Sequence, residues 1–117
     1  MLNRILEDLI SSVNGARAAI FLDGEGEFIA QAGDAAVDIK LIGAWKEIQL
    51  DSIKDIAGRL GLGGVHAVLF SVDEGNELVV PVSEEYCLLL FLSAYANLQE
   101  ALERIEDAVK RLKAEVD

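Results

Sequence analysis

Residues 16–23 read ARAAIFLD, a run in which apolar side chains follow one another almost without alternation. A strand of this kind is buried on both faces, because a strand with one solvated face alternates apolar and polar residues. The next residues, DGEG at 23–26, have the chemistry of a hairpin turn, and EFIAQAG at 27–33 returns as a more polar strand. We therefore expect a central strand that is covered on both faces and paired with an edge strand.

A helix with one apolar stripe is predicted at each end of the chain. Apolar side chains recur at helical spacing from Leu2 to Val13, and the pair at 14–15, Asn-Gly, supplies a stop. Asn97 precedes Glu100 by three residues, which resembles the start of a capping box, and a narrow apolar seam follows. The seam consists of Leu98, Leu102, Ile105, Val109, Leu112 and Val116. Each terminal helix thus has a single face to bury.

The middle helix differs, because its apolar residues cover too much of its circumference. It is expected to begin near Asp38, to contain IGAWKEIQLDSIKDIAGRL at 42–60, and to end at the glycine cluster 61–64. Its apolar positions spread over about half of the circumference, whereas one packing surface needs a stripe of about 100°. We interpret them as two stripes with Gln49 between them. Ile42, Ile53, Ala57 and Leu60 are assigned to the protein's own sheet, and Leu41, Trp45, Ile48 and Ile56 form the second stripe, which something else must cover.

Three more strands are predicted at 65–72, 77–82 and 86–94, and the short connections between them indicate an antiparallel meander. Pro81 cannot donate a ladder hydrogen bond, so we place it at a strand end or a bulge. The order of elements, α-β-β-α-β-β-β-α, belongs to the α+β class, and the length suits one domain that spans residues 1–117.

Composition excludes several classes of partner. The formal net charge is −11, so a nucleic acid or an anionic membrane surface would be repelled. The single cysteine, Cys87, lies in an apolar run and is expected to be a small buried side chain, which suits a reducing compartment. The first residues carry Glu7 and Asp8 within their apolar pattern and predict neither a signal peptide nor a membrane span. We expect a cytoplasmic protein that does not insert into a membrane.

Catalytic and metal-binding patterns are weak throughout. His66, the only histidine, stands in an apolar strand, where a structural role is the more common one. The glycines at 61–64 follow a helix and precede a strand, which is the reverse of a phosphate-binding loop, and 23–27 lacks the spacing of a calcium loop. Glu84 and Glu85 are adjacent and point apart, so they make a poor acid/base pair. We expect no catalytic residue, no cofactor and no bound metal, and hence no enzyme.

Charge is distributed unevenly along the chain. No lysine or arginine occurs between Arg59 and Arg104, whereas the middle helix contains several basic residues. Lys46 and Lys54, near the polar edge of that helix, are therefore our candidates for contacting a protein partner.

Three segments together resemble the roadblock/dynein light chain domain, in its stand-alone prokaryotic form. These are LNRILEDLISSVNGARAAIFLDGEGEFIAQAGD at 2–34, ELVVPVSEEYCLLLFL at 77–92 and NLQEALERI at 97–105. The resemblance implies a roadblock/profilin-like fold, with a five-stranded antiparallel sheet in the order 2-1-5-4-3, two helices on one face and one on the other. It also implies a homodimer that binds a small Ras-like GTPase without binding nucleotide itself. No arginine here matches a GTPase-activating finger, so activation, inhibition and scaffolding stay open.

The resemblance implies that the third strand and the middle helix form the dimer interface. This agrees with the composition of residues 65–72, an edge strand too apolar to remain uncovered. The expected interface residues are Leu41, Trp45, Ile48, Gln49, Ser52, Ile56, Val65, Ala67, Leu69 and Ser71. Two alternatives stay open: a scaffold or motor adaptor that ignores the nucleotide state of its partner, and a PAS-like sensor, which requires a sizeable cavity between the sheet and the middle helix.

Overall fold

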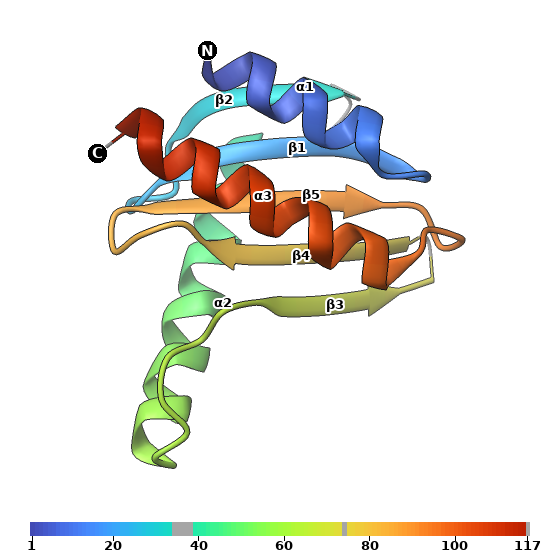
Figure 1. Ribbon diagram of the computed structural model, residues 1–117. Coiled ribbons are helices and arrows are strands. Elements are labelled where there is room, and N and C mark those ends of the chain that lie inside the picture. The colour runs from blue at the N-terminus through green and yellow to red at the C-terminus, as the bar shows by residue number, and fades with distance from the viewer. Residues whose placement is uncertain (34–38, 74, 117) are drawn as a thin grey trace.

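The computed structural model describes the backbone of residues 1–33, 39–73 and 75–116, and their side chains except for those of 39–48. It contains a five-stranded antiparallel sheet in the order β2-β1-β5-β4-β3 (Figure 1). The elements are α1 (Leu2–Ser12), β1 (Ala16–Asp23), β2 (Phe28–Gly33), α2 (Ile39–Arg59), β3 (Val68–Val72), β4 (Gly75–Pro81), β5 (Tyr86–Leu92) and α3 (Leu98–Val116). The predicted α+β class, element order and strand order are confirmed.

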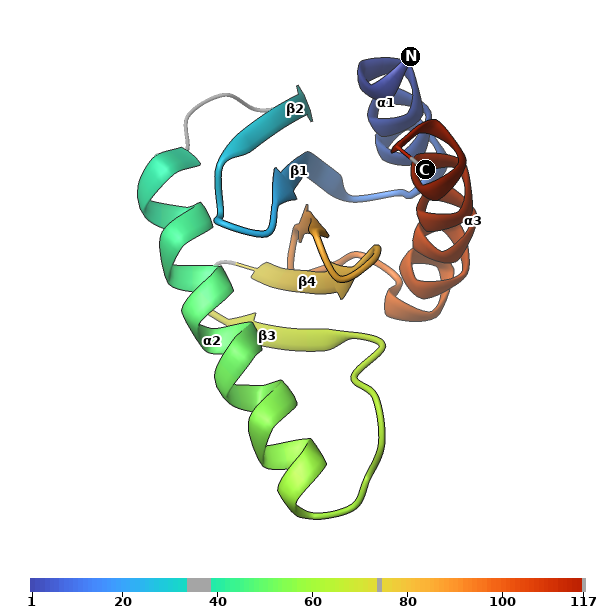
Figure 2. The same cartoon turned by 90° about the vertical axis from the view of Figure 1, so that its left-hand side faces the viewer.

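The sheet separates two layers of helices. Helices α1 and α3 lie side by side over one face, and α2 lies on the other (Figure 2). Along β1, Ala19 and Phe21 belong to the larger core beneath α1 and α3, whereas Ile20 and Leu22 belong to a smaller core with Leu50 of α2. Residues 18–22 are all buried, which confirms that this strand is covered on both faces.

Short-range signals in the sequence explain the turns between elements. The Asp23 carboxylate accepts hydrogen bonds from the N–H groups of Glu25 and Glu27, at 2.9 and 3.0 Å, and holds the β1–β2 hairpin. The Asn97 side chain accepts from the Glu100 N–H at 3.1 Å and caps α3 as predicted. The Glu100 carboxylate does not complete a reciprocal capping box. It accepts from the Asn14 N–H at 3.0 Å and so joins the start of α3 to the α1–β1 turn.

The C-terminus of α2 is closed by the glycine cluster, as its sequence predicts. The Leu62 N–H donates to the Ala57 carbonyl at 2.9 Å, and the Gly61 N–H donates to the Gly58 carbonyl at 3.1 Å. Gly61 has a φ of 70°, so the two bonds form a Schellman motif around a left-handed residue. The expected start of the helix at Asp38 lies outside the described residues.

Strand β3 is shorter than predicted, because it begins at Val68 and not at Val65. The Val82 N–H donates to the Tyr86 carbonyl on the β5 side, and neighbouring residues of a strand point their N–H groups in opposite directions. The missing N–H of Pro81 therefore lies on the side of β3. The pairing of β3 with β4 begins at Val68↔Val79, so the next hydrogen-bonded pair would be His66 with Pro81. That pair would need the N–H that Pro81 lacks, and the ladder therefore ends at Val68. Pro81 itself is the last residue of β4, as expected.

Outside α2, two burial predictions were wrong. Leu102 was assigned to the seam of α3 but is 45% exposed, because Ala101 and Ala108 occupy the face that packs on the sheet and α1. Cys87 was expected to be buried but is only half-buried, because it lies next to the turn that connects β4 and β5 and borders a small hollow there.

Candidate functional site at the free edge of β3

Strand β3 pairs with β4 on one side and with no described strand on the other. Its side chains include Leu69 and Val72, which are 45% and 59% exposed. No charged residue other than His66 occurs from Leu60 through Val72. A regular edge strand that is apolar and uncharged is a template for pairing with another chain.

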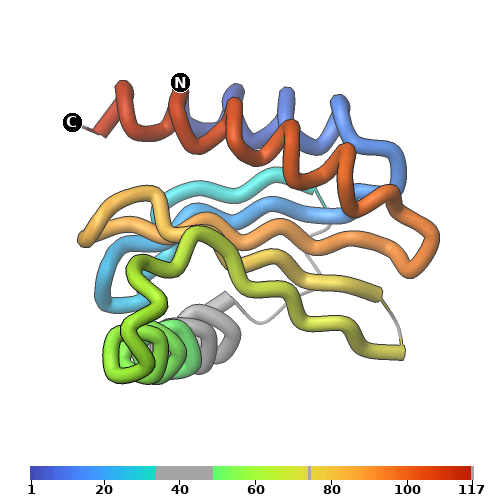
Figure 3. The backbone as a smooth tube through the Cα atoms, turned by 60° about the horizontal axis from the view of Figure 1, so that its bottom comes forward, coloured from blue at the N-terminus to red at the C-terminus, as the bar shows by residue number. Residues whose placement is uncertain are grey.

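The C-terminal half of α2 extends beyond this edge. In Figures 1 and 2 this part of the helix projects past β3, and Figure 3 shows the backbone rising from the end of α2 to the sheet at β3. Ile56, Leu60 and Leu62 are between 55% and 73% exposed along this projection. We name this edge of the molecule the β3-edge surface. It consists of the projecting half of α2, the segment that returns to the sheet and strand β3, and its exposed apolar side chains are Ile56, Leu60, Leu62, Leu69 and Val72.

The structure places part of the predicted interface on the β3-edge surface. Ser52 and Ile56 are exposed on α2, Gln49 is half-buried there, and Leu69 and Ser71 are exposed on β3. Ala67 is exposed and Val65 half-buried, but both precede the strand and do not belong to it. The predicted residues Leu41, Trp45, Lys46 and Ile48 lie among the α2 side chains that are not described.

The stripe of α2 that faces its own sheet was predicted only in part. Ile53 and Ala57 are half-buried, but Leu60 is 66% exposed, because α2 has passed the edge of the sheet by that residue. The buried anchor is Leu50, which the sequence reasoning omitted and which packs with Ile20 and Val79. Its spacing of three residues from Ile53 was the signal that could have identified it.

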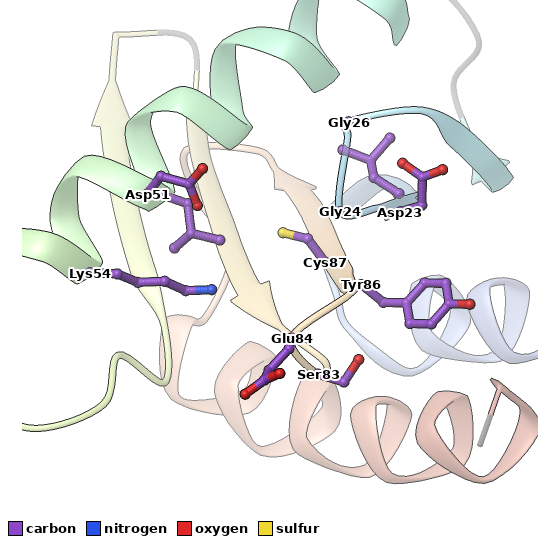
Figure 4. A pocket seen from close by; sticks show the side chains of 11 residues that line it. Asp23, Gly24, Gly26, Asp51, Lys54, Ser83, Glu84, Tyr86 and Cys87 are labelled. Atoms are coloured by element: carbon purple, nitrogen blue, oxygen red, sulfur yellow. The ribbon is translucent and has the colours of Figure 1, made fainter.

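Lys54 has a different setting from the predicted polar edge of the helix. It is half-buried and lines a hollow between α2 and the two hairpin turns, together with Asp51, Glu84 and Cys87 (Figure 4). The hollow has a volume of about 40 Å³, which is enough for only a few water molecules. This hollow is therefore much smaller than the cavity that a PAS-like sensor needs.

A larger groove lies on the opposite face of the sheet. It has a volume of about 440 Å³ and is bordered by α3, the end of β4 and the segment that precedes β3. The groove exists because the chain separates from β4 before Val68. Its lining includes Leu102, Val109 and Pro81, with His66 and Glu106 as the polar groups.

The described part of the chain contains neither a metal-binding cluster nor a membrane-spanning segment. Within residues 1–33, 39–73 and 75–116, no three histidine, cysteine or acidic side chains come together in a way that could hold a metal ion. None of the helices in these ranges combines the length and the apolar character that a bilayer crossing requires.

Comparison with known proteins identifies the fold. No family model and no curated protein matches the sequence. Among solved structures, a roadblock/LC7 domain from Streptomyces avermitilis matches with a TM-score of 0.90 and 16% identity, over 97% of this chain and 96% of the other. MglB of Myxococcus xanthus matches with a TM-score of 0.89 and 16% identity, over 97% and 92%.

MglC of Myxococcus xanthus has a higher identity, 25%, with a TM-score of 0.69 over 99% of this chain and all of the other. The three matches extend over nearly the whole chain. The chain therefore has the fold of the roadblock/LC7 domains that it matches.

Proposed function

We propose that the protein is a homodimeric, non-enzymatic regulator or scaffold that binds a small Ras-like GTPase. The observation that carries the proposal is an exposed β3-edge surface, rich in apolar side chains, in a chain whose fold matches roadblock/LC7 domains over nearly its whole length. The dimer accounts for the exposed side chains of Ile56 and Leu69, because a second copy would remove both from water.

The GTPase is proposed from the family resemblance, since the roadblock domain implies a partner of that class. The likeness to MglB and MglC supports the family resemblance, because both are similar to this chain along most of its length. The role is that of a binding module. The sequence contains no arginine that matches a GTPase-activating finger, so the proposal does not specify whether the protein activates or inhibits the GTPase.

The proposal is tested by size-exclusion chromatography and titration of the purified protein with a small Ras-like GTPase encoded nearby in the genome, loaded with GDP or with a non-hydrolysable GTP analogue. We expect the protein to elute as a dimer and to bind one nucleotide state at least ten times more tightly than the other. Equal affinity for both states would favour the scaffold alternative. A monomer without affinity for either state would refute the proposal.

Lys54 allows a finer test of the partner surface. The predicted candidates are Lys46 and Lys54, and Lys54 stands among the carboxylates of Asp51 and Glu84. Charge reversal by Lys54→Glu is expected to slow association with the GTPase by about three- to ten-fold, because electrostatic contacts act mainly on association rates. A neutral control, Lys54→Gln, should have a smaller effect. Unchanged association rates for both variants would place the contact elsewhere.

A further inference from the structure

The groove on the α3 side of the sheet has the size of a small-molecule site. Its volume is about 440 Å³, and such sites have volumes of roughly 300–1,000 Å³. Three parts of the chain form its walls, which are α3, the end of β4 and residues 65–67. In Figure 2 the segment that precedes β3 stands away from the sheet on the side of α3. The sheet therefore lies between this groove and α2.

The walls of the groove carry apolar side chains that the core leaves exposed. Leu102 of α3 is 45% exposed, and Ala67 is exposed as well. Beyond Val68↔Val79 the same register would set Ala67 across from Val80, which also borders the groove. An apolar group seated between these side chains would remove Leu102 from water.

The polar side chains of the groove favour a cation over an anion. Glu106 contributes a carboxylate, and among the described residues that border the groove there is no lysine or arginine. The hydrogen bonds and ion pairs of the described residues include none from the side chain of Glu106 or of His66. A carboxylate only accepts hydrogen bonds, and a neutral imidazole has one acceptor nitrogen. Both side chains are therefore available to a donor group on a ligand.

Pro81 adds a third acceptor from the backbone. The Val82 N–H donates to the Tyr86 carbonyl on the β5 side, so alternation directs the carbonyl of Pro81 toward the side of β3. Proline has no N–H, and the pairing with β3 begins only at Val68↔Val79. The Pro81 carbonyl therefore faces the side on which the chain has left β4, with no donor beside it.

The acceptors lie beyond the apolar walls in one direction along the groove. Helix α3 and strand β4 run in the same direction (Figure 1). Glu106 therefore follows Leu102 in the direction in which Pro81 follows Val80. The four residues from Leu102 to Glu106 span about 6 Å along the helix axis. A ligand that uses both parts of the groove needs its polar group about 6 Å from its apolar body.

We propose that this groove binds a small apolar amine. Its ammonium group is held by Glu106, His66 and the Pro81 carbonyl, and its three N–H donors match these three acceptors. Its apolar body packs against Leu102 and Val80. A carboxylic acid of the same size would instead meet a like charge at Glu106. The site lies across the sheet from α2 and does not rest on the proposed GTPase partner.

Three matched compounds test the chemistry of the ligand. The compounds 3-phenylpropylamine, 3-phenylpropan-1-ol and 3-phenylpropanoic acid share an apolar body and differ in the polar group at its end. They are titrated into nitrogen-15-labelled protein at neutral pH, and the amide shifts are followed by NMR. The amine should shift the amides of residues 65–67, 80 and 102–109 and bind at least five-fold more tightly than the alcohol. The acid should bind more weakly than the alcohol.

Two exposed glutamates of α3 provide a matched pair of variants. Glu106→Gln removes the carboxylate from the groove and should weaken amine binding at least three-fold, while alcohol binding stays within two-fold. Glu103→Gln removes the same charge from a residue that does not border the groove, so both affinities should stay within two-fold. An equal loss of amine binding in the two variants would mean that the amine responds only to net charge, and would overturn the site.

The remaining outcomes concern the place and the class of the ligand. Amine shifts confined to other residues, or an alcohol that binds as tightly as the amine, would overturn the proposal. The dipeptide N-acetyl-phenylalanyl-lysine amide carries an aromatic ring and an ammonium on a peptide backbone. If it binds in the groove at least ten-fold more tightly than 3-phenylpropylamine, the groove receives a protein segment and the assignment to a small amine is wrong. Equal or weaker binding of the dipeptide supports the small amine.

Discussion

The two edges of the sheet differ in how they are protected. At the β2 edge the register shifts between Phe21 and Leu22, so Ile29 is an extra residue that forms a bulge, and α1 packs over the strand. At the β3 edge the pairing with β4 runs without a shift from Val68 to Val72, and neither α1 nor α3 makes a substantial contact with the strand. Bulges and covering helices are the means by which proteins prevent edge-to-edge association. Within the part of the chain that the structure describes, only the β2 edge carries them, which marks the β3 edge as the one available to another chain.

The largest expected effect comes from placing a charge on each edge in turn. Leu69→Lys should weaken the dimer about 1000-fold, or about 4 kcal/mol, because two-fold symmetry buries the unpaired ammonium twice. The matched change on the other edge is Ile29→Lys, since Ile29 is 36% exposed and Leu69 is 45% exposed. Sedimentation velocity over a concentration series measures the dimer dissociation constant of each variant. If the two variants weakened the dimer equally, the β3 edge would not be the one through which the copies associate.

A second, smaller effect separates the anchored part of α2 from its projecting part. Leu50→Ala should lower the free energy of unfolding by about 3 kcal/mol, because Leu50 is 6% exposed in a packed core. Leu60→Ala, beyond the sheet edge, should change it by less than about 0.5 kcal/mol. Urea denaturation in a Leu69→Lys background removes the contribution of the dimer. Similar losses for both variants would mean that α2 is held along its whole length.

The smallest effect concerns the point where β3 leaves β4. Pro81→Val restores a donor on the β3 side, so the ladder should extend to His66 and change stability by no more than about 1 kcal/mol. Hydrogen exchange of the amide that this substitution introduces at position 81 should be slowed at least ten-fold relative to an unpaired amide. If that amide exchanges freely, the proline is not the reason that β3 begins at Val68.

Much of the fold followed from local chemistry in the sequence. The Asp23 turn, the Asn97 cap and the Gly61 helix end each form the hydrogen bonds that their residue types predict. The uninterrupted apolar run of β1 correctly predicted a strand covered on both faces, because residues 18–22 are all buried. The strand order came from the family resemblance and was confirmed by the sheet.

Other features depended on how the elements are placed in three dimensions, which the spacing of apolar residues in the sequence does not specify. Leu60 has the spacing of a buried residue, but α2 is longer than the sheet is wide at that point, so the residue is exposed. The length of β3 depended on the direction of the Pro81 nitrogen, which is known only once the β4–β5 register is known. The predicted interface residues Leu69 and Ser71 do lie on the strand at the free edge. The surroundings of Lys54 could not be predicted, because they depend on where both hairpin turns lie relative to α2.

Hydrogen exchange at the β3 edge tests the central claim most directly. In the wild-type protein, at concentrations where the dimer forms, the amides of positions 69 and 71 should exchange at least 100-fold more slowly than in Leu69→Lys, because the partner strand accepts their hydrogen bonds. Amides of β1 and β5 should exchange alike in both proteins. Equally fast exchange of the two β3 amides in the wild type and the variant would contradict the account.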